Sequence, residues 1–248
     1  MVGSNRIRGL KWGIMLLLIT LATSTLSAQD FQHSEHRREI LSIKTNLLYD
    51  AMYMPGYDAF APIPNVALEY YPKKGHITFG GGVDIPWYEN NKDHKVFQIA
   101  NYQLFSRYYL HTNDTQQGAA YRGLYFSAYA HGGMYSICFD NQKGREGEGF
   151  GGGIGAGYVL GLGKSQHWRL EFGLQMGLMY TQYGHYAWFE NEPGIPDGFQ
   201  TTDPSGLGHT DKRPHHYTWI GPTRLEITLS YDLLYRKNHS KGISFHNK

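Results

Sequence analysis

Residue types that could do chemistry are sparse in this chain of 248 residues. Ser127 and His131 fall on one face of a predicted strand, and Asp84 falls on the same face of another, which supplies the residue types of a Ser-His-Asp hydrolase site. Positions four apart on a strand lie roughly 13 Å apart, beyond hydrogen-bond reach. We therefore expect His131 to be a hydrogen-bonded interior residue, and we expect no catalytic residues and no enzyme.

A histidine-rich segment near the C-terminus is the second chemical candidate. His209, His215 and His216 lie close in sequence to Asp203 and Asp211, and imidazole and carboxylate groups are ligands that zinc accepts. The spacing matches no closed zinc site, and the segment is rich in Gly and Pro. A solvated surface loop is the better interpretation, so we predict no metal site.

The glycine repeats of residues 149–163 (GFGGGIGAGYVLGLG) could be mistaken for a dinucleotide-binding fingerprint. No helical pattern follows them, and no acidic residue stands at the distance expected for ribose binding. A glycine-rich strand explains the segment better, and we predict no cofactor.

The N-terminus has the pattern of an export signal. Arg6, Arg8 and Lys11 form a basic region, residues 13–22 are apolar, and a small-residue stretch ends at Ala28. We predict a signal peptide over residues 1–28 and a flexible polar leader over residues 29–38. An uncleaved membrane anchor is the alternative.

The composition of the mature chain excludes some classes of function. Without the three basic residues of the signal, 20 Lys and Arg stand against 21 Asp and Glu, so no basic field predicts binding to nucleic acid. Cys138 is the only cysteine, which rules out an internal disulfide. The 31 Gly and 20 Tyr residues of the full chain are typical of membrane β-barrels, in which aromatic residues sit at both interfaces.

Alternation of apolar and polar residues with period two recurs along the mature chain and predicts strands. The links between them are longer at one end than at the other, as in outer-membrane barrels. A barrel is predicted over residues 39–235, with a polar tail over residues 236–248. The eight predicted strands are residues 39–53, 64–71, 76–87, 96–110, 122–135, 149–163, 167–183 and 217–233.

Aromatic residues on the apolar parity lie near both ends of these strands. They predict two girdles, and hence an all-β, eight-stranded antiparallel transmembrane β-barrel, an up-and-down meander in the outer membrane. Its partners would be outer-membrane lipid and the barrel-assembly machinery. A soluble periplasmic β-domain is the alternative. The aromatic residues are Tyr49, Trp87, Tyr180 and Trp219 at one end, and Tyr70, Tyr108, Trp168 and Tyr231 at the other.

Charged residues occupy the opposite parity and would face the interior. Eight strands leave a bore that side chains fill, where unpaired charges are costly. We therefore predict an ion-pair network that plugs the lumen, with a narrow path for a small solute or protons as the alternative. The predicted network comprises Lys44, Glu69, Asp84, Arg107, Arg169, Glu171, Arg224, Glu226 and Asp232, and parity adds Asp50 to the interior.

The predicted outer loop of residues 184–216 holds Tyr186, Trp188, Phe189 and Phe199 among Gly, Pro and Asp. Exposed aromatic residues on a long loop suit contact with a surface protein or a glycan. Packing of these rings on one another over the barrel mouth is the alternative.

Three segments resemble a family of outer-membrane barrels common in Bacteroidetes, DUF3575. They are residues 43–50 (IKTNLLYD), 64–71 (PNVALEYY) and 219–227 (WIGPTRLEI), within a resemblance that runs from about residue 40 to 233. The resemblance implies a small outer-membrane β-barrel, often accompanied by fimbrial or surface-assembly genes, and supplies no catalytic residues. The polar tail departs from barrels that end on an aromatic residue, and we expect residues 231–235 to serve the assembly machinery instead.

The leading hypothesis is a barrel with a plugged lumen and a structural or surface-interaction role, linked to fimbrial or surface assembly. A narrow small-solute channel and a lipid-modifying barrel enzyme are the alternatives from other functional classes.

Overall fold

The computed structural model describes residues 39–54, 57, 59–90, 92–112, 121–140, 143–163, 167–195, 197–202 and 213–235. The chain divides into two units, Met1–Ser34 and Glu35–Lys248, and the described residues all belong to the second. The predicted signal peptide, leader and polar tail lie outside the described residues. No helix within the described part is long and apolar enough to cross a membrane.

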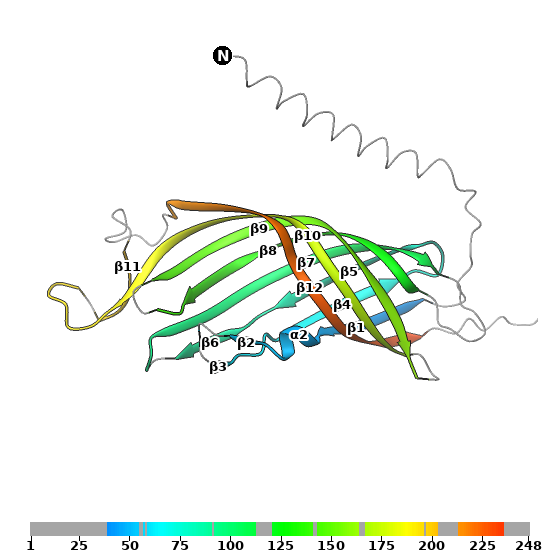
Figure 1. The fold of residues 1–248 in the computed structure, drawn as a ribbon, viewed down its shortest axis with the longest axis horizontal. Coiled ribbons are helices and arrows are strands. Elements are labelled where there is room, and N and C mark those ends of the chain that lie inside the picture. The colour runs from blue at the N-terminus through cyan, green and yellow to red at the C-terminus, as the bar shows by residue number, and fades with distance from the viewer. Residues whose placement is uncertain are drawn as a thin grey trace, which may run out of the picture. The chain divides into compact units, whose positions relative to one another are not determined.

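Eight antiparallel strands form a closed ring (Figure 1). Each pairs with the next in chain order, and the last pairs with the first, so every strand has two neighbours. The predicted all-β, antiparallel arrangement of eight strands in chain order is confirmed. The strands are β1 (Ile40–Asn46), β4 (Asn65–Tyr71), β5 (Ile77–Asp84), β7 (Lys95–His111), β8 (Arg122–Cys138), β9 (Gly144–Leu162), β10 (Trp168–Phe189) and β12 (His215–Tyr235).

The two ends of the ring differ. At the end where β1 finishes, which we name the loop end, short strands add to the long ones: β6 (Trp87–Asn90) pairs with β7, and β11 (Gly198–Thr201) pairs with β10. A separate hairpin of β2 (Tyr53–Met54) and β3 (Ala59–Phe60) follows β1. The opposite end, where β1 begins and β12 finishes, is named the turn end.

The first predicted strand is shorter than the sequence pattern indicates. β1 stops at Asn46, and the chain turns into the short helix α2 (Leu47–Asp50). The Asn46 side chain caps this turn by accepting a hydrogen bond from the Leu48 amide at 3.2 Å. Asp50 accepts hydrogen bonds from the Thr45 hydroxyl at 2.7 Å and from Asn65 at 2.8 Å. The prediction that Asp50 is an inward residue of a strand is therefore wrong.

Other strand boundaries also differ from the predicted ones. The third predicted strand breaks into β5 and β6 around Pro86, which has no amide hydrogen to donate. β9 begins at Gly144 and β10 runs to Phe189, so the predicted loop of residues 184–216 starts as a strand. The additional residues pair with each other, with Gly144 opposite Tyr186.

Inward glycines on β9 and β10 lie beneath large side chains from β8. A Cβ on Gly177 would lie 2.5 Å from the Tyr129 hydroxyl, and a Cβ on Gly173 would lie 2.7 Å from the Tyr125 hydroxyl. On Gly157, a Cβ would overlap both the Tyr125 hydroxyl and a backbone oxygen. The glycines therefore make room for tyrosines that fill the interior.

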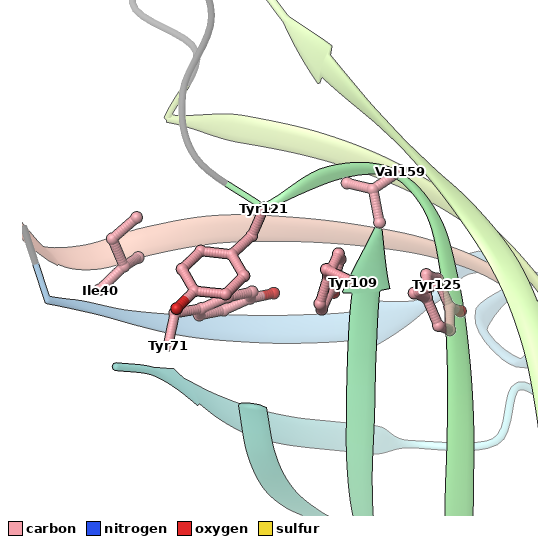
Figure 2. Packing of buried hydrophobic residues seen from close by; sticks show 6 residues of the cluster. All are labelled: Ile40, Tyr71, Tyr109, Tyr121, Tyr125 and Val159. Carbon is pink, nitrogen blue, oxygen red and sulfur yellow. The ribbon is translucent and has the colours of Figure 1, made fainter. Parts of the chain in front are cut away.

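The turn end of the interior is filled by aromatic packing (Figure 2). The rings of Tyr71 and Tyr121 meet edge to face with centroids 5.2 Å apart, and those of Tyr109 and Tyr125 lie 5.4 Å apart. We name this group the tyrosine cluster. Its members are Ile40, Tyr71, Tyr109, Tyr121, Tyr125 and Val159, each at most 2% exposed.

Substitution of Gly157 by Ala tests this packing. We expect the variant to lose about 1–3 kcal/mol of unfolding free energy because the new methyl group displaces Tyr125. The measurement is the urea midpoint followed by tryptophan fluorescence. Gly132→Ala on β8 is the control, since its Cβ would approach no atom closer than 3.4 Å. Equal midpoints for the two variants would contradict the packing argument.

Candidate functional site

The charged residues at the centre of the ring form a buried cluster. Lys44 contacts Glu69, and its ammonium lies 2.6 Å from Glu171. The Arg107 guanidinium lies 2.6 Å from Glu171, 3.1 Å from Glu69 and 3.4 Å from Glu226. None of these five side chains is more than 9% exposed. We name them the central charge cluster.

A second pair lies on the loop-end side of that cluster. The Arg224 guanidinium donates to both carboxylate oxygens of Asp84, at 2.7 and 3.2 Å, and its Nε lies 3.0 Å from Glu226 of the central charge cluster. The Tyr49 ring covers this guanidinium at 4.7 Å. Tyr49 therefore points into the ring, and its prediction as an outward girdle residue is wrong, because helix α2 turns it inward.

A third pair lies at the turn end. Arg169 donates to both oxygens of Asp232, at 3.0 and 2.8 Å, and both side chains are at most 1% exposed. The Arg169 guanidinium also stacks over the Tyr71 ring at 4.5 Å. This contact joins the charged pair to the tyrosine cluster.

The structure thus brings all nine sequence-predicted interior charges into ion pairs with one another. Among these nine residues, four cations face five anions, so their charges nearly balance. Neutral side chains donate further hydrogen bonds to the carboxylates. Thr78 and Tyr71 donate to Glu69, Ser230 donates to Glu171, and Gln175 donates to Glu226. Buried charges that each face an opposite charge are suited to holding positions rather than to proton transfer.

The Ser-His-Asp candidates do not form a relay. Asp84 accepts from Arg224 and from Asn101, and His131 Nδ1 lies 3.4 Å from the Asn101 side-chain oxygen. Among the described residues, no hydrogen bond joins Ser127 to His131. The carboxylate is thus separated from the imidazole by an amide and engaged by a guanidinium.

The histidine-rich segment is partly strand. His215 and His216 begin β12 rather than lying in a loop, which corrects the prediction for these two residues. The His215 ring contacts that of His185 with centroids 4.4 Å apart. Asp203, His209 and Asp211 lie outside the described residues. Within the described part, no three His, Cys, Asp or Glu side chains are grouped to hold a metal ion.

The predicted outer-loop aromatic residues lie on strands instead. Tyr186, Trp188 and Phe189 belong to β10, and Phe199 belongs to β11, because the loop folds back as an added strand. The Phe199 ring meets Tyr186 and Trp188 edge to face, with centroids 5.3 and 5.0 Å apart. These three rings pack on one another, as the self-packing alternative expects, and contact with a partner stays a prediction.

The sequence pattern missed the other members of this group, which we name the loop-end cluster. His94 stacks on Trp188 with centroids 3.9 Å apart, and Val96 and Cys138 pack near Tyr186. Burial raises the pKa of the Cys138 thiol, which keeps it protonated and unreactive. Burial also raises the pKa of the Tyr186 phenol to about 12. The only signal in the sequence was the excess of aromatic residues at the end of β10 and on β11.

Comparison with known proteins gives one match. A family model described as "Protein of unknown function (DUF3575)" matches residues 14–233, most of the chain. Neither the curated proteins nor the solved structures include a match.

Substitution of Arg169 by Met tests the buried pairing. We expect a loss of about 3–5 kcal/mol, because the buried Asp232 carboxylate loses the guanidinium that donates to both of its oxygens. The double variant Arg169→Met/Asp232→Asn should regain much of that loss, since neither charge remains. The measurement is the free energy of unfolding in urea.

Lys143→Ala is the control for this experiment. It breaks the exposed pair of Lys143 and Asp140, which are 3.9 Å apart, and we expect no measurable change. A double variant no more stable than Arg169→Met would show that the pair does not act through charge compensation.

Proposed function

The chain belongs to the DUF3575 family, and we propose that it is an outer-membrane β-barrel whose plugged interior holds a rigid, structural or surface-interaction platform at the cell surface.

The observation that carries this proposal is the inverted distribution of polar and apolar side chains between the inner and outer faces of the ring. Its interior is charged, whereas all eight strands expose large apolar side chains on the outer face. Soluble proteins rarely expose a contiguous apolar surface of this extent, whereas lipid chains are its natural surroundings. The exposed residues include Ile43 (β1), Leu68 (β4), Phe79 (β5), Leu104 (β7), Phe126 (β8), Ile154 (β9), Leu174 (β10) and Leu225 (β12).

The separation of two aromatic residues on β10 is close to the thickness of the apolar layer of a membrane. Trp168 and Tyr180 are twelve residues apart on this strand. At a rise of about 3.3 Å per residue and a tilt of about 45°, this separation corresponds to roughly 28 Å along the ring axis. The apolar band of outer-membrane barrels is about 25 Å tall. Each residue also has an aromatic neighbour on the next strand, Tyr231 for Trp168 and Phe150 for Tyr180.

Closure of the ring supports the same proposal, because a strand in lipid must have its backbone groups paired on both sides. β1, β4 and β5 are short, but backbone hydrogen bonds continue beyond their ends. The Ile63 amide donates to Tyr49 and the Ile85 amide to Pro64, each at 2.8 Å. Leu47 and Ile85 keep apolar side chains exposed in this region.

The filled interior favours a structural role over a narrow channel. The tyrosine cluster occupies the turn end, and the central charge cluster lies beyond it with every charge paired. A permeating solute would have to displace both. The hydrogen-bond partners of Asp84 and His131 likewise favour a non-enzymatic role over a lipid-modifying enzyme.

The surface role follows from the asymmetry of the ends. The longest strands extend into the loop end, where β6 and β11 are added and the loop-end cluster packs. In this proposal it faces outward and meets a surface protein or glycan, and the turn end faces the periplasm. The link to fimbrial or surface assembly rests on the family resemblance, and insertion would use the barrel-assembly machinery.

Cell fractionation combined with a heat-modifiability gel tests membrane insertion. We expect the chain in the outer-membrane fraction, with a band that shifts on boiling. Leu174→Arg should strongly reduce the folded, heat-modifiable band, because Leu174 lies midway between Trp168 and Tyr180, where a cation costs about 2–4 kcal/mol.

Leu162→Arg is the matched control, since Leu162 is similarly exposed (37% against 43%) but lies at the turn end of β9. There a cation costs only about 0–1 kcal/mol, and the band should persist. A soluble periplasmic protein with no shift, or equal tolerance of both variants, would contradict insertion.

Epitope insertion tests the orientation. A tag placed after Pro193, in the exposed segment between β10 and β11, should be detected by antibody on intact cells. The same tag placed after Gly163, at the turn end beyond β9, should be detected only after the outer membrane is permeabilised. The reverse pattern would place the loop end in the periplasm and remove the basis of the surface role.

A further inference from the structure

A cavity of about 360 Å³ lies inside the ring, on the loop-end side of the Asp84–Arg224 pair. Small-molecule pockets typically span about 300–1,000 Å³, so its size suits a small ligand. We propose that this cavity binds a small, uncharged, mainly apolar molecule carrying at most one hydrogen-bonding group. The proposal concerns the interior and does not rest on membrane insertion.

The walls of the cavity are largely apolar. Ile63 and Pro86 line it from the segments beside α2 and β6, Ile99 lines it from β7, Ile137 from β8 and Met179 from β10. The rings of Tyr49, Tyr129 and Tyr135 complete the wall. Apolar walls offer water few hydrogen-bonding partners, whereas they stabilise an apolar ligand by removing its surface from water.

The polar side chains that line the cavity mostly bond to one another. Gln103 donates to Gln175 at 2.8 Å, and the hydroxyls of Tyr135 and Thr181 lie 2.9 Å apart. Tyr129 is similarly bonded to Thr223. Their hydrogen-bonding capacity is therefore largely used within the protein, and a strongly polar ligand would find few partners.

Charge selection follows from the Asp84–Arg224 pair at the cavity floor. Each group already faces an opposite charge at 2.7 Å, and the Tyr49 ring covers the guanidinium. A charged ligand would lose its hydration and gain no free counter-charge, which is unfavourable. An uncharged ligand avoids this cost.

His131 is the reason that one hydrogen-bonding group is allowed. Asn101 donates its amide to Asp84, so its oxygen faces His131 Nδ1, which must then carry the hydrogen. His131 Nε2 is left as an acceptor, and it is buried beside Gly151 with no hydrogen-bond partner in the described part of the chain. A ligand hydroxyl would satisfy this nitrogen after a rotation of the ring away from Gly151.

Methyl NMR on the folded full-length chain tests the proposal, with ¹³C labels on Met and Ile. The probes are 2-naphthol, which is uncharged at pH 7, and 2-naphthalenesulfonate, an anion with the same ring system. We expect 2-naphthol to shift the methyl signals of Met179 and Ile99 saturably, and we expect the sulfonate not to.

The outward residues Met176 and Ile154 are internal controls for non-specific partitioning, because they lie on β10 and β9 with exposures of 46% and 71%. Met179→Trp should fill the cavity and weaken 2-naphthol binding at least tenfold. Met176→Trp, on the outer face of the same strand, should leave binding unchanged and shows that an added tryptophan alone has no effect.

Three results would overturn the proposal. Shifts confined to Met176 and Ile154 would mean that the probe only partitions onto the outer face. Equal binding of the sulfonate would show that the cavity does not select against a charged ligand. Unchanged binding in Met179→Trp would place the ligand outside this cavity.

Discussion

An eight-stranded ring is so narrow that inward side chains from opposite walls must pack on each other. Here that constraint acts on charged residues: Lys44 of β1 reaches Glu171 of β10, and Arg107 of β7 reaches the same carboxylate. A charge placed inside such a ring without a partner would be costly. The positions of the interior cations, anions and neutral donors therefore depend on one another.

The interior side chains form three successive regions along the ring axis. Aromatic packing fills the turn end, paired charges fill the centre, and a cavity with apolar walls lies on the loop-end side of Asp84 and Arg224. Glycines of β9 and β10 allow this arrangement because Tyr125 and Tyr129 lie across them. The filling that argues against a through-channel lies on the turn-end side of this cavity, which is why a ligand site and a plugged interior are compatible.

Period-two alternation was sufficient to predict which charged residues of the strands face inward, because parity on a strand is a local property. Asp50 was the exception, because it lies in helix α2 and not on a strand. It failed where a side chain redirects the backbone. Asn46 caps α2 and turns Tyr49 over Arg224, and no alternation pattern contains that information. It also failed for the end of β10, where Tyr186 and Trp188 pair with β11, the strand that contains Phe199. The cavity was unpredictable because its walls come from segments distant in sequence.

The buried polar contacts also explain how the ring closes in one register. The first and last strands meet through Asn46, whose amide donates to the Leu225 carbonyl at 3.0 Å and whose oxygen accepts from the Ile227 amide at 3.2 Å. Ser42 bonds Asp232 across the same seam. A slip of one residue would turn Ser42 and Lys44 to the apolar outer face and take the Lys44 ammonium away from Glu171. Apolar packing alone tolerates such errors better than paired charges do, so the interior network supplies specificity at the seam, where contacting residues are farthest apart in the chain.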